Sequence, residues 1–122
     1  MKRVLILEDD DVVQQFMVKI LKMLGAEPVI AGNPQKAEEA LSNLENIDLA
    51  IVDLILPFIT GWDVIDRIRK SGPAVKNLPI VVLTGAAVSE KEKAKLLTKV
   101  DAVVWKGDFA LDEFVGILKR WL

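Results

Sequence analysis

Short apolar segments recur along the chain and alternate with stretches of helical period. The segments are rich in Val, Ile and Leu and mostly unbroken, and they cover Arg3–Leu7, Pro28–Ala31, Leu49–Val52, Ile80–Leu83 and Ala102–Trp105. Continuous runs of this length are typical of parallel strands that are covered on both faces. The pattern therefore predicts a buried parallel sheet with one strand for each segment.

The first two intervening stretches have clear helix signals. Apolar residues on one face mark the first helix: Val12, Val13, Phe16, Met17, Ile20, Leu21 and Leu24. Gly25 follows as a C-terminal stop. Asn33 and Pro34 predict the N-cap and first position of a second helix, whose apolar face is formed by Ala37, Ala40, Leu41 and Leu44.

Further helices are predicted after the third, fourth and fifth strands. Residues Trp62–Arg69 repeat at helical spacing before Ser71–Pro73 ends the segment, and Phe114–Trp121 form the last helix. Ser89 with Glu92 is a capping box for the helix between them. Strand and helix thus alternate along the chain, which predicts an α/β fold with a doubly wound five-stranded parallel sheet and right-handed crossovers.

The composition fits one domain of 122 residues, of which 52% are hydrophobic. The net charge of −2 gives no reason to expect direct binding of nucleic acid. Apolar runs are far shorter than the roughly 18 to 20 residues of a membrane span. The opening segment MKRVLILEDDD does not resemble a signal peptide, and the absence of cysteine fits a cytoplasmic protein.

The chain also contains no histidine. Without His or Cys it cannot form zinc or copper sites, or nucleophile pairs of the Ser–His or Cys–His type. Any metal must be held by oxygen atoms, which points to Mg²⁺, Mn²⁺ or Ca²⁺.

Charged and hydroxyl side chains follow four of the predicted strands. Glu8–Asp11 come after the first strand, Asp53 after the third, Thr84 after the fourth and Lys106 after the fifth. The carboxyl ends of parallel strands form one edge, where such sheets bind their ligands. Carboxylates that converge there repel one another unless a cation lies among them, and their hard oxygen atoms suit Mg²⁺.

A carboxylate at this edge can attack phosphorus and form an acyl phosphate. Asp53 is the candidate, because it is the one carboxylate within the apolar segment IVDLILPFITG. Lys106 could neutralise a phosphoryl oxygen, and the Thr84 hydroxyl could donate to another. Taken singly, each group also has an ordinary structural interpretation, and Asp10 or Asp11 is expected to cap the first helix.

The segments VLILEDD, IVDLILPFITG, VVLTGA and VVWK resemble the receiver domain of bacterial two-component response regulators. The spacing Asp53-x-x-x-Pro57-x-x-x-Gly61 is similar to the family's phosphoacceptor loop. The resemblance covers the whole chain and implies a flavodoxin-like (βα)5 fold with strand order 2-1-3-4-5. It also implies a single receiver domain over residues 1–122, without an output domain, that signals and is not an enzyme.

The resemblance assigns roles to the residues at the strand ends. Asp53 matches the phosphoacceptor, Thr84 the switch hydroxyl and Lys106 the lysine that contacts the phosphoryl group. Asp9 matches a direct Mg²⁺ ligand and Glu8 a ligand acting through water. The carbonyl of Ile55 and the carboxylate of Asp53 complete the metal site, which could also hold Mn²⁺.

The same resemblance implies partners. A histidine kinase or a histidine phosphotransfer protein would donate the phosphoryl group, which fits a chain without histidine of its own. Phosphorylation would switch a surface for a downstream protein, and the chain itself is expected to be a monomer or weak dimer.

Two features depart from the family pattern. Lys106-Gly107-Asp108-Phe109 stands where the family usually has Lys-Pro-Phe with a cis bond. A cis bond before a residue other than proline costs about 2.5–4 kcal/mol. The family pattern therefore does not predict the conformation of this loop. Asp108 is expected either to compete for Lys106 or to cap the last helix.

The second departure is Val103, where the family often has an aromatic switch residue. Val103 cannot act in that way, and Trp105, two residues on, is interpreted as a core residue. Ile55 and Ala86 occupy positions that tune phosphate lifetime in the family. Both are apolar and cannot orient an attacking water, which predicts slow self-dephosphorylation.

Alternative functions follow from the same residues. A pseudo-receiver would share the fold and act as an interaction module independent of phosphorylation, and the two departures favour it. A phosphatase with an aspartyl nucleophile would place that residue after the first strand and carry a cap. A flavodoxin-like cofactor binder would need a glycine- and hydroxyl-rich phosphate loop, where this chain has EDDD.

Overall fold

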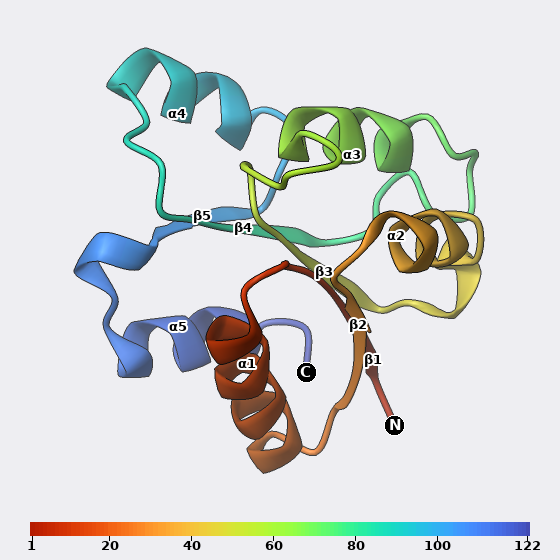
Figure 1. Ribbon diagram of the computed structural model, residues 1–122, viewed down its shortest axis with the longest axis horizontal. Coiled ribbons are helices and arrows are strands. Elements are labelled where there is room, and N and C mark those ends of the chain that lie inside the picture. Colours follow the sequence, from red (N-terminus) through yellow and green to blue (C-terminus); the bar gives the residue numbers. More distant parts are fainter.

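The computed structural model describes residues 1–122 as a central parallel sheet with helices on both faces (Figure 1). The strand order is β2-β1-β3-β4-β5, with all neighbours parallel, as expected. The strands are β1 (Arg3–Leu7), β2 (Glu27–Ala31), β3 (Leu49–Val52), β4 (Ile80–Thr84) and β5 (Ala102–Trp105). Thr84 is therefore the last residue of its strand and does not follow it.

Each predicted helix is present, but Leu44 and Trp121 lie beyond the ends of the helices in which they were predicted. The helices are α1 (Asp11–Met23), α2 (Pro34–Leu41), α3 (Gly61–Arg69), α4 (Glu90–Leu97) and α5 (Leu111–Leu118), with 3-10 turns η1 (Leu44–Asn46) and η2 (Lys106–Asp108). Figure 1 shows α1 and α5 on one face of the sheet and α2, α3 and α4 on the other. None of the helices combines the length and the apolar character that crossing a membrane requires.

Successive strand residues point to opposite faces and form two cores. Leu5 and Leu7 of β1 pack under α2, α3 and α4, whereas Val4 and Ile6 pack against α1 and α5. All four are fully buried. Burying an aliphatic side chain of this size contributes about 1.5–3 kcal/mol, so the unbroken apolar strands drive the assembly of all three layers.

Helix ends follow the predicted local signals. Asp10 caps α1, and its Oδ1 accepts hydrogen bonds from the Val12 and Val13 N–H groups at 2.8 and 3.1 Å. Asn33 caps α2, and Ser89 caps α4 by accepting from the Glu92 N–H at 3.1 Å. These caps hold the helices at the edge of the sheet where the strands end.

Two expectations about the burial of apolar side chains need correction. Val12 and Phe16 share a helix face with the buried Met17, yet they are 78% and 39% exposed. The first turns of α1 lie at the carboxyl edge of the sheet, where the strands have ended and no longer cover them. Trp105, interpreted as a core residue, is 52% exposed because it is the last residue of the edge strand β5.

Candidate functional site

The chain buries three polar or charged residues, and all lie at the carboxyl edge of the sheet. Glu8 follows β1, Asp53 follows β3 and Thr84 ends β4, with 3%, 7% and 1% of their surfaces exposed. Burying a carboxylate costs several kcal/mol unless a partner compensates for it. The partners of Glu8 and Asp53 therefore define the site.

Lys106 is the partner of both carboxylates. It begins η2 directly after β5, and its Nζ lies 2.7 Å from Glu8 Oε2 and 3.1 Å from Asp53 Oδ2. Burial alone would lower the pKa of Lys106, but its hydrogen bonds to Glu8 and Asp53 and their negative charges raise that pKa above its usual value. Lys106 thus stays charged and binds the residues that directly follow β1 and β3.

A negatively charged cluster remains around this lysine. Carboxylate oxygens of Glu8, Asp9 and Asp53 lie within 4.8 Å of one another, with Asp9 exposed. Burial, together with the charge of Asp53, raises the pKa of Glu8 even though Lys106 and the Asp10 N–H hydrogen-bond to it. Three carboxylates against one ammonium group leave excess negative charge, and their hard oxygen donors fit a divalent cation such as Mg²⁺.

The loop after β3 holds Asp53 in place. The Ile55 N–H donates to Asp53 Oδ1 at 3.1 Å, and Ile55 bridges to Thr60. The Gly61 N–H then donates to the Leu54 carbonyl at 2.8 Å and closes the loop. A Cβ at Gly61 would stand 2.5 Å from Leu54 Cα and 2.7 Å from the Asp53 carbonyl oxygen, so this close approach requires glycine.

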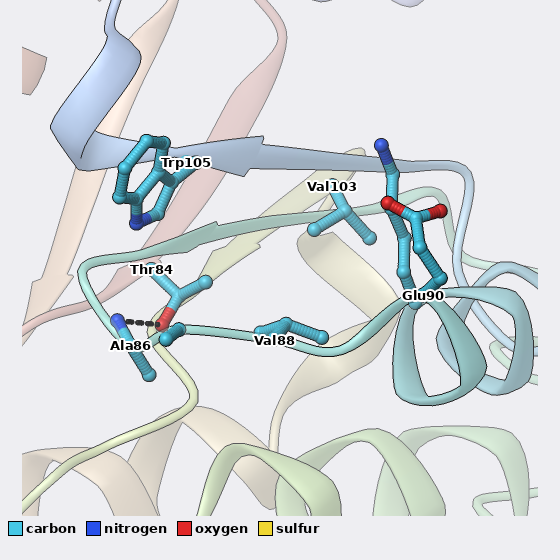
Figure 2. Close-up of a pocket in the computed structure, with 8 residues that line it drawn as sticks. Thr84, Ala86, Val88, Glu90, Val103 and Trp105 are labelled. Atoms are coloured by element: carbon cyan, nitrogen blue, oxygen red, sulfur yellow. Dashed lines mark hydrogen bonds between the residues drawn. The ribbon is translucent and has the colours of Figure 1, made fainter.

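Thr84 lies apart from the ion-paired groups. Its Oγ1 accepts a hydrogen bond from the Ala86 N–H at 3.0 Å (Figure 2) and makes no hydrogen bond to Asp53 or Lys106. A cavity of about 380 Å³ opens beside it, lined by side chains that include Val88, Val103 and Trp105. The structure thus places this hydroxyl between the acidic cluster and a cavity toward α4.

The loop after Lys106 forms a tight turn in which every peptide bond is trans. Both expectations for Asp108 are wrong, because it makes no ion pair with Lys106 and does not cap α5. Ala110 is the N-cap of that helix, with no side-chain hydrogen bond. Asp108 is instead exposed at the end of the turn.

Comparison with known proteins decides the family. The family model described as the response regulator receiver domain matches residues 4–117 of the chain. This range contains nearly the whole sheet, helices α1 to α4 and most of α5. The chain belongs to this receiver domain family. Receiver domains are signalling domains that pair with histidine kinases, and in this one the acidic pocket is suited to a divalent cation.

Solved structures of similar receiver domains cover the full chain. The response regulator TrrA from Thermotoga maritima, in complex with Mg²⁺-BeF, is 31% identical, with a TM-score of 0.79 and 100% of both chains covered. The chemotaxis protein CheY4 from Vibrio cholerae is 25% identical, with a TM-score of 0.81 and 100% and 99% of the two chains covered.

Curated relatives are longer proteins. A cyclic di-GMP phosphodiesterase from Thermotoga maritima is 42% identical over 71 residues, which is 58% of this receiver domain and 18% of the relative. The matched segments cover 11% and 15% of two further relatives. The similarity to these proteins is thus confined to a small part of each.

Two features near the site were not predicted from the sequence. Gln14 of α1 donates its side-chain N–H to the Glu8 carbonyl at 2.6 Å, and Gly32 lacks the Cβ that would displace this amide. The Trp105 ring lies where a Cβ of Gly107 would stand. Neither contact follows a local sequence rule, because each depends on how separate segments meet in space.

Proposed function

We propose that this receiver domain accepts a phosphoryl group on Asp53 and thereby switches a surface for protein–protein interaction. The donor is a phosphorylated histidine of a histidine kinase or a histidine phosphotransfer protein. One observation supports this most strongly: the chain's buried polar and charged residues, Glu8, Asp53 and Thr84, all lie at one edge of the sheet, with Lys106 bound to the two acids.

The proposed metal is Mg²⁺, with Mn²⁺ as a substitute. Asp9 and Asp53 would hold it through their carboxylates and Ile55 through its backbone carbonyl, whereas Glu8 would act through a water molecule. When bound, Mg²⁺ offsets the negative charge of the phosphoryl oxygens. The similar TrrA protein was solved with Mg²⁺-BeF, which supports this proposal.

The transfer forms one bond and breaks one. A carboxylate oxygen of Asp53 bonds to phosphorus while the phosphorus–nitrogen bond of the phosphohistidine breaks, and the electron pair stays on the imidazole, which then takes a proton from water. The product on Asp53 is an acyl phosphate. Buried Asp53 is a suitable nucleophile because the N–H of Ile55 and the ammonium of Lys106 fix both of its oxygens.

Lys106 and Thr84 would contact the transferred phosphoryl group. The ammonium of Lys106 would exchange its contact with Asp53 Oδ2 for one with a negatively charged phosphoryl oxygen. The hydroxyl of Thr84 would donate to another oxygen, and its movement would carry the change to the loop after β4. Ile55 and Ala86 supply no group that orients water, so the acyl phosphate is proposed to persist.

Intact-mass spectrometry tests this function. The purified protein is incubated with Mg²⁺ and acetyl phosphate, beside the Asp53→Asn variant and a sample with the metal chelated. We expect the mass of one phosphoryl group in the wild-type protein with Mg²⁺ and in neither control. Absence of an adduct while calorimetry shows Mg²⁺ binding would contradict the proposal and support a pseudo-receiver.

A further inference from the structure

The position of Lys106 depends on a turn with few internal supports. No side chain caps η2, and none caps α5 after it. The turn also contains Gly107, the residue type with the greatest backbone freedom. Yet Lys106 must extend from this turn, past β4, to reach Glu8 and Asp53. Some contact outside the turn has to restrict it.

The indole of Trp105 makes such a contact. A Cβ built on Gly107 would lie 2.6, 2.8 and 2.9 Å from ring atoms Cζ2, Cε2 and Cη2 of Trp105. The ring thus occupies the volume that a side chain at Gly107 would need. Figure 2 shows Trp105 at the end of β5, beside the 3-10 turn η2 and near Thr84 and Ala86.

Phe109 anchors the far end of the turn. Its ring centroid lies 5.5 Å from that of Phe16 and 5.3 Å from that of Phe114, in edge and tilted geometries. Phe109 packs against the core under α1 and α5, whereas Trp105 lines the cavity beside Thr84, toward α4. The turn is therefore anchored on both sides of the sheet, and Lys106 lies between the two anchors.

We propose that Trp105 is a positioning residue that acts through Gly107 to hold the Lys106 ammonium against Glu8 and Asp53. The proposal rests on the proposed phosphoryl transfer for its kinetic consequence, but the contact itself does not. Trp105 is 52% exposed, so core packing does not account for a large aromatic residue at this position. The part of the indole that is covered lies against Gly107. There it restricts the backbone conformations that glycine would otherwise allow the turn to adopt.

The kinetic test compares Trp105→Ala, Trp105→Phe, Lys106→Met and the Trp105→Ala/Lys106→Met double variant. Phosphorylation by acetyl phosphate is followed at saturating Mg²⁺. We expect Trp105→Ala to slow it about tenfold, because a misplacement of about 1 Å can cost up to 10²-fold. Trp105→Phe, which keeps a ring, should restore most of the rate. The double variant should be no slower than Lys106→Met, since the indole then has no ammonium to position.

A second comparison uses the shape of the contact. Gly107→Ala places a methyl group in the volume of the indole and should slow phosphorylation in the wild-type background. In the Trp105→Ala background the same methyl group fills vacated space and restricts the turn, so it should recover part of the lost rate. Slowing by the same factor in both backgrounds would overturn the proposal.

A spectroscopic measurement separates this inference from the proposed function. The ammonium resonance of Lys106, assigned with Lys106→Met, is recorded by ¹⁵N NMR without any phosphodonor. We expect Trp105→Ala to shift and broaden it. Calorimetry should show Mg²⁺ affinity raised by less than in Lys106→Met, because the ammonium is displaced from Glu8 and Asp53 but is still present. An unshifted resonance, or equal slowing by Trp105→Ala with and without Lys106, would overturn the proposal. A wild-type protein that takes no phosphate would contradict the proposed function alone.

Discussion

Lys106 is bound by two carboxylates that a metal ion would also use. Its Nζ lies 2.7 Å from Glu8 and 3.1 Å from Asp53, both of which belong to the acidic cluster. An opposite charge at this distance lowers the affinity of the carboxylates for a second cation. Lys106, which is proposed to assist phosphoryl transfer, is therefore expected to oppose metal binding.

Lys106→Met separates these two effects. We predict that the variant binds Mg²⁺ about tenfold more tightly, equivalent to about 1.4 kcal/mol, because Glu8 and Asp53 no longer share their charge with an ammonium group. Phosphorylation by acetyl phosphate should nevertheless slow by about 10²-fold, as for the loss of one donor to a developing charge. Calorimetry and intact-mass kinetics measure the two quantities.

Lys99→Met is the matched control for Lys106→Met. Lys99 also donates to a carboxylate, Asp66, at 2.9 Å, but this pair lies on the surface away from the acidic cluster. Neither Mg²⁺ affinity nor phosphorylation should change. Weaker Mg²⁺ binding in Lys106→Met would show that the lysine organises the metal ligands and does not compete with the metal.

At the scale of elements, the Asp53 loop depends on the absence of a side chain at Gly61. A Cβ there would meet backbone atoms of Leu54 and Asp53 at 2.5 and 2.7 Å, and these atoms cannot rotate away as a side chain could. Overpacking of this kind costs about 1–3 kcal/mol. We predict that Gly61→Ala lowers the free energy of unfolding by this amount, measured by urea denaturation, and slows phosphorylation.

Gly116 provides the opposite case in α5. Nothing lies within 4 Å of a Cβ built at this position, which is inside the helix and two residues before its last residue, Leu118. Alanine is favoured over glycine in a helix interior by about 0.5–1 kcal/mol, so Gly116→Ala should stabilise the domain. If both alanine variants changed stability in the same direction, the close approach at Gly61 would not be the cause.

Arg69 connects elements at the opposite edge of the sheet. From the end of α3, its guanidinium donates to the carbonyls of Lys99, Lys76 and Leu78 at 2.8, 3.0 and 2.6 Å. It joins the segment before β4 to the segment before β5. Hydrogen bonds from a charged group contribute about 1.5–3 kcal/mol, so Arg69→Met should lower the free energy of unfolding by an amount in that range.

Arg67 on the same helix is the control for Arg69. It donates two hydrogen bonds to Glu38 of α2, at 2.6 and 2.8 Å, but the two side chains are 37% and 66% exposed, and solvent-exposed pairs contribute little. Arg67→Met should change the urea midpoint far less than Arg69→Met, with phosphorylation unaffected in both. Equal effects of the two substitutions would show that the carbonyl contacts of Arg69 do not stabilise the fold.

At the scale of the whole molecule, metal binding should increase the free energy of unfolding. A ligand that binds only the folded state at 100 times its dissociation constant stabilises by about 2.7 kcal/mol. We predict that Mg²⁺ raises the unfolding free energy of the wild-type domain accordingly, and that Asp9→Asn removes most of this gain. Asp63→Asn, an exposed carboxylate of α3, should retain it. Equal Mg²⁺ stabilisation in both variants would exclude Asp9 as a ligand.

The features that the sequence predicts correctly are those fixed by local chemistry. The apolar runs become the strands, and Asn33 and Ser89 cap helices because a cap needs only the next turn. Parallel strands place their carboxyl ends at one edge of the sheet, and this rule correctly predicts that Glu8, Asp53, Thr84 and Lys106 lie at that edge. The exposure of Phe16 and Trp105 could not be predicted, because it depends on where the covering layers end.

The central claim is that the carboxylate of Asp53 takes the phosphoryl group, and mapping the acceptor tests it most directly. After reaction with acetyl phosphate and Mg²⁺, borohydride reduces an acyl phosphate to an alcohol, so a phosphorylated aspartate is read as homoserine by peptide mass spectrometry. We predict homoserine at position 53 and at no other aspartate. Homoserine at Asp9, Asp10 or Asp11 instead, or unmodified Asp53 in a protein that has gained the phosphoryl mass, would contradict this assignment.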